Sequence, residues 1–430
     1  MEALADVPAT EPLTDEQLIE LLAQVAPAPE QKLKVSFPPD AYRKAITFIA
    51  GVSPKKSTLP VLSMIHCQSN GATTFRASDL DIFASVEVPE VAAVEGECLI
   101  PRTALLAALK SGKRTVAIEL RPKLMVDIVT DGMKQTVPSI SVEDFVPLPK
   151  YEPSVRLKVS ASMFKEALKR CALAMSEDAS RYVLNGVAIE CSPNGIVLVA
   201  TDGRRLHKVE MHRLDYDSDW AARLQELEAN SKAAAEAMEK FQQAQRFTLI
   251  VPTATVEHLL KLPITTYDIL SIEAEPMKDG GENVPAPWCA FQYERIGLIS
   301  RQIQGRYPNF RQVIPHDMKE KIRLEADALA TAVNQVKTIT TEKEVSVKLT
   351  FTGQKLTVSA SSVEKGQSST EIATNYDGKD VGVALNPKYL LDALTAFKGL
   401  EIEFGINDEL CPVKLVNGST LAVIMPMRLS

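Results

Sequence analysis

Hydrophobic positions along the chain form one pattern that occurs three times. In each copy an apolar strand end meets a proline, and leucines three and four residues apart follow, as in LIPRTALLAALK (99–110), IVPTATVEHLLK (250–261) and ALNPKYLLDALT (384–395). Proline suits the first helical turn because its missing N–H would have no partner there. Leucines at this spacing form one face of a helix. Each copy therefore predicts a strand followed by a helix.

A second helix is predicted upstream in each copy, at 39–52, 160–175 and 325–339. Between the two helices lie alternating apolar and polar residues, rich in β-branched side chains, at 73–88, 195–211 and 354–372. Alternation with a period of two is typical of half-buried antiparallel strands. The predicted fold class is therefore α+β. Because the unit repeats, we expect three similar helix/antiparallel-sheet domains near residues 32–150, 154–316 and 320–430.

Three segments do not fit the repeat. Residues 1–31 look like a tail, in which Thr14 and Gln17 form a capping pattern before leucines at helical spacing. This predicts a short amphipathic helix, either free on its tether or docked on its own domain. Residues 213–246 predict one long surface helix inserted in the second domain, with a packed decoration favoured over a partner site. Residues 275–288, rich in Gly and Pro, predict a loop.

Composition narrows the class of protein. The chain of 430 residues is 45% hydrophobic and 24% charged, as expected for a globular protein of more than one domain. The sequence has no apolar run of about 18 residues and no signal-peptide pattern, so we expect a cytoplasmic protein without a membrane segment. The six cysteines form no CxxC and the five histidines no HxxxH, which favours buried thiols, no disulfides and no metal site. The net charge of −7 argues against a surface that binds nucleic acid everywhere.

One acidic group is a candidate metal site. Asp79 and Asp81, with Asp202 of the second copy, are compatible with a metal-dependent nuclease or transferase. The repeat favours a structural role, because ASDLD takes the place of ATDGR and an aspartate before a hairpin turn accepts backbone N–H groups. The third copy has no aspartate there. No motif of a catalytic triad, phosphate loop or dinucleotide site occurs, so we expect no catalytic residue and no cofactor.

Basic residues gather on the predicted helices and at their ends, although the chain is acidic. This distribution fits helices that line a surface facing phosphate, and a solvated helix face is the alternative. No aromatic residues are interleaved for base stacking, so readout of base sequence is not expected. The basic residues are Arg43, Lys44, Lys55, Lys56, Arg102, Lys110, Lys113, Arg114, Lys165, Lys169, Arg170, Lys261, Lys337, Lys388 and Lys398.

Four motifs occur in order along the repeats: RYVLNG (181–186), VATDGRRL (199–206), SRQIQGRYPNFRQVIP (300–315) and MPMRL (425–429). Together with the threefold repeat, they resemble the β sliding clamp family of bacterial DNA polymerase III over about residues 32–430. The resemblance implies a processivity factor of the DNA-clamp fold, in which two chains associate head to tail into a six-domain ring with helices lining the hole. The implied partners are double-stranded DNA, bound without regard to sequence, and a second copy of the chain. Polymerase III subunits, the clamp loader, other polymerases and repair proteins would bind through short peptides.

The resemblance also implies a peptide pocket between the second and third domains. Arg204 and Gln312 depart from the family pattern at its edge, where histidine and a basic residue are common, so the preferred peptide stays open. The residues carried over are Leu184, Thr201, Gly203, Arg204, Arg205, Leu206, Pro308, Val313, Asn386, Tyr389, Val423, Met425, Pro426, Met427, Arg428 and Leu429.

DNA-facing side chains and a subunit interface follow from the same resemblance. The interface is expected near Val137 in the first domain and Ile339 in the third. A monomeric peptide-binding module is the alternative to the ring. The residues expected to face DNA are Lys55, Lys56, Lys165, Lys169, Arg181, Tyr182 and Lys337.

Overall fold

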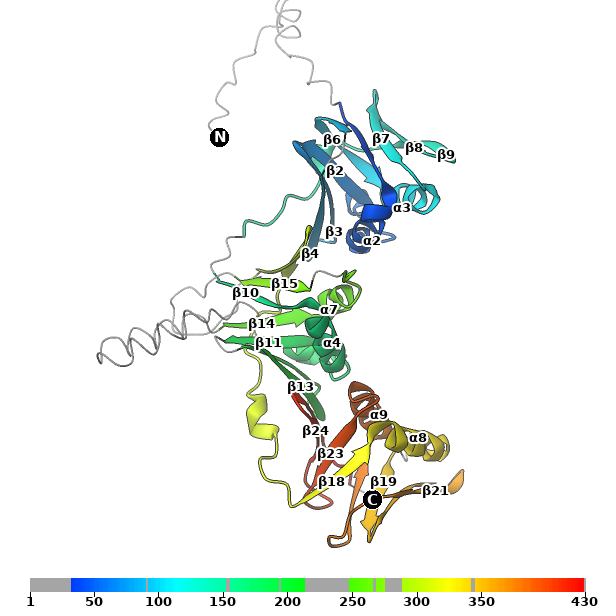
Figure 1. The fold of residues 1–430 in the computed structure, drawn as a ribbon, viewed down its shortest axis with the longest axis vertical. Coiled ribbons are helices and arrows are strands. Elements are labelled where there is room, and N and C mark those ends of the chain that lie inside the picture. Colours follow the sequence, from blue (N-terminus) through cyan, green and yellow to red (C-terminus); the bar gives the residue numbers. More distant parts are fainter. Residues whose placement is uncertain are drawn as a thin grey trace, which may run out of the picture. The chain divides into compact units, whose positions relative to one another are not determined.

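The computed structural model describes residues 32–89, 92–151, 155–192, 195–212, 247–265, 268–274, 288–341 and 345–428. The chain divides into two compact units (Figure 1). Unit 1 contains residues up to Arg43, 55–76 and 87–145, and unit 2 contains 44–54, 77–86 and 146 onward. The helices predicted within 1–31 and 213–246 lie outside the described residues, as does the predicted loop up to residue 287.

Unit 1 is built from antiparallel strands and one complete helix. One sheet has the order β5-β1-β7-β8-β9, and β2 pairs with both β3 and β6. Helix α3 (Arg102–Ser111) directly follows Pro101 at the end of β6 and buries Leu105 and Leu109. The strands are β1 (Lys34–Phe37), β2 (Met64–Asn70), β3 (Ala72–Ser78), β5 (Ala92–Val94), β6 (Gly96–Pro101), β7 (Val116–Arg121), β8 (Met125–Thr130) and β9 (Met133–Pro138), with short 3₁₀ turns η1 (Pro60–Ser63) and η2 (Val142–Asp144). Helix α2 (Pro39–Ala50) begins in this unit.

Unit 2 contains the other sheets, which are also antiparallel. Their orders are β10-β15-β16-β17-β4, then β14-β11-β12-β13-β25-β24-β23-β18, and β21-β20-β19-β22. The strands are β4 (Ile82–Val88), β10 (Val155–Ser160), β11 (Gly186–Ser192), β12 (Gly195–Thr201), β13 (Arg205–His212), β14 (Phe247–Pro252), β15 (Ile269–Ala274), β16 (Trp288–Tyr293), β17 (Ile296–Arg301), β18 (Glu320–Glu325), β19 (Val347–Thr352), β20 (Lys355–Ser362), β21 (Gly366–Ala373), β22 (Val381–Leu385), β23 (Glu401–Ile406), β24 (Val413–Asn417) and β25 (Thr420–Ile424).

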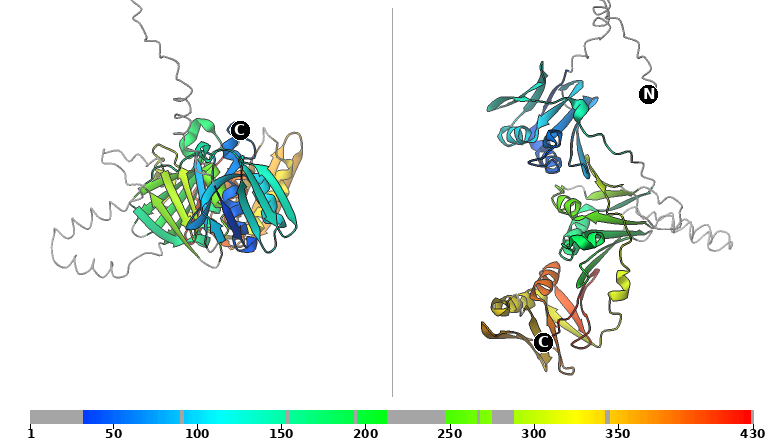
Figure 2. Two further views of the ribbon diagram at one scale, coloured as in Figure 1. Left: turned by 90° about the horizontal axis from the view of Figure 1, so that it is seen from above. Right: turned by 180° about the vertical axis from the view of Figure 1, so that it is seen from behind.

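The helices of unit 2 lie in pairs against these sheets. Helices α8 and α9 contact each other, as do α4 and α7, and both pairs are visible in Figures 1 and 2. Ser160 caps α4 by accepting the Met163 N–H (3.2 Å), and Asn386 caps α9 by accepting the Lys388 N–H (2.9 Å). The helices are α4 (Ala161–Ala172), α7 (Thr253–Leu259), α8 (Ala326–Val336) and α9 (Pro387–Ala396), with 3₁₀ turns η3 (Ala179–Leu184), η4 (Phe310–Val313) and η5 (Lys337–Ile339).

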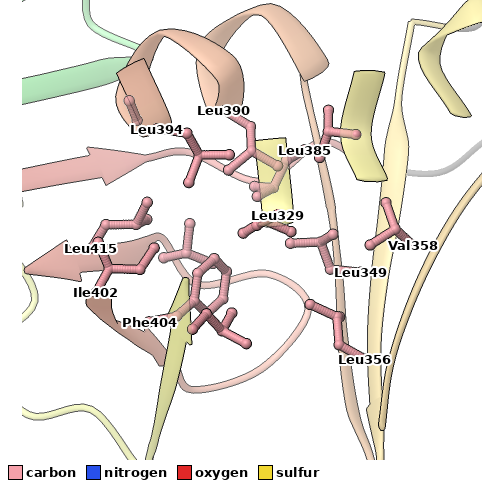
Figure 3. Packing of buried hydrophobic residues seen from close by; sticks show 14 of the residues in the cluster. Leu329, Leu349, Leu356, Val358, Leu385, Leu390, Leu394, Ile402, Phe404 and Leu415 are labelled. Carbon is pink, nitrogen blue, oxygen red and sulfur yellow. The ribbon is translucent and has the colours of Figure 1, made fainter. Parts of the chain in front are cut away.

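The core beneath α8 and α9 explains why leucine spacing predicted them. Leu329 of α8 and Leu390 of α9 point into the same cluster as Leu349 of β19 and Phe404 of β23 (Figure 3), and all four are fully buried. Burying each such side chain stabilises the fold by about 1.5–3 kcal/mol relative to leaving it exposed. The leucine stripe on each helix therefore fixes the face that it presents to the strands.

The six predicted helices and the alternating strands are confirmed, with two corrections to detail. Four helices end two or three residues earlier than their patterns suggested; they are α2, α4, α7 and α8, which end at Ala50, Ala172, Leu259 and Val336. Cys411 is half-buried rather than buried, because it lies in a turn where its thiol contacts Asp408 (3.2 Å). The other five cysteines are buried. In the part of the chain that the structure describes, no helix is long and apolar enough to cross a membrane. The domain boundaries stay a prediction.

Candidate functional site

The turn between β12 and β13 is held by its own side chains. The Asp202 carboxylate accepts the Arg204 and Arg205 N–H groups (2.8 and 3.0 Å). The Thr201 hydroxyl donates to the Arg205 carbonyl (2.6 Å) and accepts the Gly203 N–H (3.1 Å). Gly203 has φ +85°, a left-handed conformation that favours glycine. This closed turn presents Arg204 to solvent and directs Arg205 inward.

The segment after β25 continues across this turn. β25 pairs with β13 so that Val423 lies opposite Leu206, and the Met425 N–H then donates to the Arg204 carbonyl (2.9 Å). The Met427 N–H donates to the Ala384 carbonyl at the end of β22 (2.8 Å). Pro426 lies between them and has no N–H to leave without a partner. The two methionines are therefore fixed on the protein by alternate backbone bonds.

Arg205 ties this turn to helix α9. Its side chain is only 7% exposed; Nε donates to Asp202 (3.1 Å), and Nη1 donates to Asp392 of α9. Its guanidinium also lies over the Tyr389 ring, 4.6 Å from the ring centre. The charge of Arg205 is thus satisfied inside the protein, and its guanidinium shapes the site by holding Tyr389.

Apolar residues form a buried floor and an exposed rim. Leu206 and Val423 are 2% exposed and pack with Phe310 of η4 in one small cluster. Val313, at the other end of η4, is 52% exposed, and Met425 is 43% exposed. Large apolar side chains exposed together on a soluble protein mark a binding surface. Leu184 is buried, and Pro308 is exposed.

A cavity of about 440 Å³ adjoins this rim, and Met427 and Arg428 line it. The sequence did not point to Leu410, which also lines the cavity and is 63% exposed. Asp408 holds that loop by accepting the Leu410 N–H (2.9 Å). The sequence feature that could have indicated this residue is a single leucine within the polar run NDELCP (407–412). The other lining residues are Lys348, Thr350, Thr352, Asp380, Val381, Gly382, Val383, Ala384 and Glu409.

The pocket residues expected from the sequence lie at the end of η3, from Thr201 to Leu206, around η4, at the start of α9 and after β25, and two of them, Met427 and Arg428, line the cavity. Asn386 is there too, but its side-chain oxygen caps α9, so only its amide nitrogen is left to meet a ligand. Leu429 lies outside the described residues. The assignment of these residues to peptide binding stays a prediction.

The β3–β4 turn repeats the same geometry in unit 2. The Asp79 carboxylate accepts the Asp81 and Ile82 N–H groups (3.0 and 2.6 Å), as Asp202 does for its turn. Leu80 has φ 84°, the conformation that Gly203 adopts. The Arg301 N–H donates to the Asp81 carbonyl (2.8 Å), just as the Met425 N–H donates to the Arg204 carbonyl in the other turn. The turn interpretation of these aspartates is confirmed, and among the described residues no group of three or more His, Cys, Asp or Glu is placed to hold a metal.

Cations differ between sheets and helices. Several strand cations pair with carboxylates of neighbouring strands, as in Arg156–Glu273 (3.0 Å) and Lys355–Glu371 (2.9 Å). Lys134 of β9 and Lys348 of β19, in contrast, make no ion pair with a described carboxylate. Arg43 and Arg170 are the helix residues that pair within their own helices, with Asp40 and Glu166. The other helix cations make no ion pair with a carboxylate of the described residues; they are Lys44, Lys110, Lys169 and Lys388, with Lys55, Lys56, Lys113, Arg114, Lys261, Lys337 and Lys398 beyond helix ends.

The residues expected to face DNA form two groups: some are exposed, and others donate hydrogen bonds to carbonyl groups of the protein. Lys55, Lys56, Lys169 and Lys337 are exposed, and Tyr182 is 60% exposed. Lys165 instead donates to the Leu262 carbonyl (2.9 Å), which ties α4 to the end of α7. Arg181 donates to the Asp202 carbonyl (3.2 Å) and so lies against the pocket turn.

The two residues expected at the subunit interface lie on or beside outer strands. Val137 is in β9, at the end of its sheet in unit 1. Ile339 ends η5, which contacts β21, the outer strand of its sheet in unit 2.

Two buried histidines are neutral near pH 7. Burial lowers the pKa of His207 to about 4, although its Nδ1 lies 2.8 Å from the Arg170 carbonyl oxygen. Burial likewise lowers the pKa of His258 to about 4, where its ring packs on Phe48.

Comparisons with known proteins find similarity to bacterial sliding clamps. The models described as "DNA polymerase III beta subunit, C-terminal domain" and "DNA polymerase III beta subunit, central domain" match residues 311–428 and 158–222. The chain is 27% identical over 384 residues to the beta sliding clamp of Chlamydia pneumoniae, covering 89% of this chain and 95% of that protein. It is 26% identical over 415 residues to that of Caulobacter vibrioides, covering 92% and 100%. The chain is therefore similar to β sliding clamps over nearly its whole length.

Solved sliding clamps share the fold. The clamp of Pseudomonas aeruginosa bound to griselimycin matches with a TM-score of 0.79 at 21% identity, covering 92% of this chain and 100% of that one. The clamp of Bacillus subtilis matches with a TM-score of 0.78 at 19% identity, covering 93% and 100%. The repeated α+β architecture is therefore the sliding-clamp fold.

Proposed function

We propose that this chain is a non-catalytic sliding clamp, which encircles duplex DNA and tethers the replicative polymerase for processive synthesis. The observation that carries the proposal is similarity to sliding clamps over nearly the whole chain, with matches that span 89–92% of it. The chain would act in the cytoplasm, where replication proteins of this family meet DNA.

The division of cations supports the DNA-binding part of the proposal. Several strand cations are neutralised by carboxylates, whereas helix residues such as Lys110 and Lys169 make no ion pair with a carboxylate of the described residues. Arg43 and Arg170 are exceptions among the helix cations. Cations without such partners can contact phosphate, and phosphate contacts carry no sequence information. A ring holds DNA by topology, so these contacts can be few and weak enough to permit sliding.

Outer strands support assembly into a ring. β9 of unit 1 and β21 of unit 2 each pair on one side only within the described residues. Such edges invite pairing with another chain unless something covers them. Two different edges on one chain fit a head-to-tail contact, and two copies close it into a ring with Val137 and Ile339 near each junction.

The rim around Met425 and Leu410 supports peptide recruitment. Methionines are flexible and polarizable, so they can repack around different apolar anchors. Polymerase III subunits, the clamp loader, other polymerases and repair proteins are the proposed partners. Each fully buried apolar side chain of such a peptide would contribute about 1.5–3 kcal/mol.

Two measurements test the assembly and the pocket. Light scattering in line with sizing chromatography should give twice the chain mass of 47.0 kDa; a single-chain mass would favour the monomeric peptide-binding module. Griselimycin, which is bound in the P. aeruginosa clamp structure, serves as a pocket probe. Met425→Ser and Leu410→Ser should each weaken its binding. Val363→Ser, at a hairpin residue that is 93% exposed, is the matched control and should not.

A further inference from the structure

The net charge of the chain lies in its first 31 residues. Residues 1–31 contain seven acidic residues and no Lys or Arg, which equals the net charge of −7 of the whole chain. Residues 32–430 therefore hold 48 basic and 48 acidic residues and are neutral overall. Blocks of one charge sign at a chain end are often interaction tails.

Unit 1 carries a basic surface at the end of α3, formed by Lys110, Lys113 and Arg114, which we name the α3 basic turn. All three residues are exposed, and none makes an ion pair with a carboxylate of the described residues. The nearby Asp131 carboxylate accepts the backbone N–H groups of Lys113 and Arg114 (3.1 and 2.7 Å) rather than pairing with their side chains. The hydrogen bond from the Arg114 N–H and, to a lesser extent, the Arg114 charge lower the pKa of Asp131, so this one carboxylate offsets part of the charge and the turn stays net positive.

Two strand cations of the same unit, in contrast, are neutralised by ion pairs. Lys34 pairs with Glu119 (3.8 Å), and Arg121 pairs with Asp127 (3.1 Å). Lys34 and Arg121 are thus already neutralised, whereas the α3 basic turn keeps a net positive charge that a polyanion can neutralise.

The acidic segment joins unit 1 at the end of the β1–β7 pair that is farther from this turn, but within reach of it. The Leu33 carbonyl accepts the Leu120 N–H (2.9 Å) at one end of the β1–β7 pair, and Thr115 lies at the other end. The five residue steps from Leu120 to Thr115 span about 17 Å of strand. Gly96 fixes the entry point, because a Cβ there would lie 1.6 Å from the Lys32 carbonyl oxygen. A chain of 31 residues can extend about 100 Å, so the turn is well within its reach.

We propose that residues 1–31 act as a built-in counter-ion that occupies the α3 basic turn when DNA is absent, so that duplex DNA must displace them. The inference rests on the proposed function, because it adds a competitor for the phosphate contacts of a clamp. A tether of this kind gives an effective concentration on the millimolar scale. Exposed ion pairs are individually weak, so the tail competes with DNA without blocking it.

Salt provides the signature of such competition. Both the tail and DNA bind by charge, and screening shortens the Debye length from about 10 Å at 0.1 M salt to about 3 Å at 1 M. Removing the tail should tighten binding of a short linear duplex by about three- to tenfold at about 50 mM salt. The gain should disappear by about 300 mM salt.

Three variants separate charge from bulk and from apolar docking. One lacks residues 1–31, one carries amides at all seven acidic positions, and one carries serine at Leu13, Leu18, Leu21 and Leu22. Fluorescence anisotropy with the duplex should show the first two binding more tightly than the natural chain, and the third unchanged. A neutral tail that behaves like the natural one overturns the proposal, because the tail then acts by bulk. A serine tail that behaves like the deletion also overturns it, because the tail then docks by its leucines.

A measurement without DNA tests the contact itself. A labelled peptide of residues 1–31 should bind the chain that lacks them, and Lys110→Glu with Lys113→Glu should abolish that binding. Lys355→Glu, on strand β20, is the matched control and should not. Absence of peptide binding at low salt overturns the inference whatever the DNA result. If the peptide binds but the ring is not retained on circular DNA, the proposed function fails and the counter-ion contact stands.

Discussion

The Arg205 contact between the pocket turn and α9 makes a quantitative prediction. Arg205→Met removes the cation and leaves Asp202 and Asp392 facing an apolar side chain. The Arg205 side chain is 7% exposed, and those of Asp202 and Asp392 are 16% and 28% exposed, so little water can replace the lost partner. Removing one partner of a buried pair costs about 3–5 kcal/mol. Asp202 keeps two backbone donors, which places the expected cost near the lower end.

Hydrogen exchange measures this cost locally, which matters because a chain of several domains need not unfold in one step. A cost of about 3 kcal/mol corresponds to about a hundredfold faster exchange. The faster exchange should appear in β13 (Arg205–His212) and in the first turn of α9. If these amides already exchange through global unfolding, the increase should instead match the loss of global stability. Asp392→Asn, which keeps an acceptor, should show the same pattern with a smaller change.

Arg323→Met is the matched control. Arg323 also faces a glutamate across two strands, Glu401 at 3.7 Å, but its side chain is 83% exposed. Exposed pairs contribute about 0–1 kcal/mol, so exchange near β18 should change less than about fivefold. If Arg205→Met changes exchange no more than Arg323→Met does, the guanidinium is not the tie between the turn and α9.

Three further predictions follow from single features. The pKa of His207 is about 4 in the folded chain, whereas that of an exposed histidine is about 6.5. Between these pH values the unfolded chain binds more protons, so stability should fall as the pH drops from about 6.5 toward 4. The unfolding temperature of His207→Gln should depend less on pH, whereas a variant of the exposed His316 should keep the full dependence. Leu80→Gly should leave the unfolding midpoint unchanged or raise it. It relieves about 1–2 kcal/mol of strain in a leucine at φ 84°, and the greater flexibility of glycine in the unfolded chain offsets part of this gain. Gly203→Leu should lower the midpoint, because a Cβ there would lie 2.7 Å from the Arg181 guanidinium. Deleting Met425–Ser430 should abolish griselimycin binding yet leave the dimer by light scattering, because β25 ends at Ile424; unchanged binding would refute the pocket assignment.

Local patterns predicted most of the fold because the forces that set them are local. Proline at a helix start and leucines at helical spacing decide where α3 and α9 begin and which face they bury. Alternation decides which face of β20 is buried. The aspartate turns were also predictable, because the Asp79 and Asp202 carboxylates satisfy N–H groups only two and three residues away.

Contacts between distant residues escaped prediction. Arg205 was expected to face a peptide, but its charge is taken up by Asp392, 187 residues along the chain. Leu410 reaches the cavity only because the β23–β24 connection carries it there. Whether a lysine or arginine is neutralised depends on which carboxylates the neighbouring strand or turn places beside it. These facts depend on register and packing, which spacing along one chain does not contain.

Retention on DNA of defined topology tests the ring most directly. The chain, loaded on nicked circular DNA, should remain bound at about 1 M salt, where charge contacts are screened beyond about 3 Å. It should leave once the circle is cut, because a ring slides off a free end. Release that depends on salt alone, and is the same for circular and linear DNA, would contradict the sliding-clamp account.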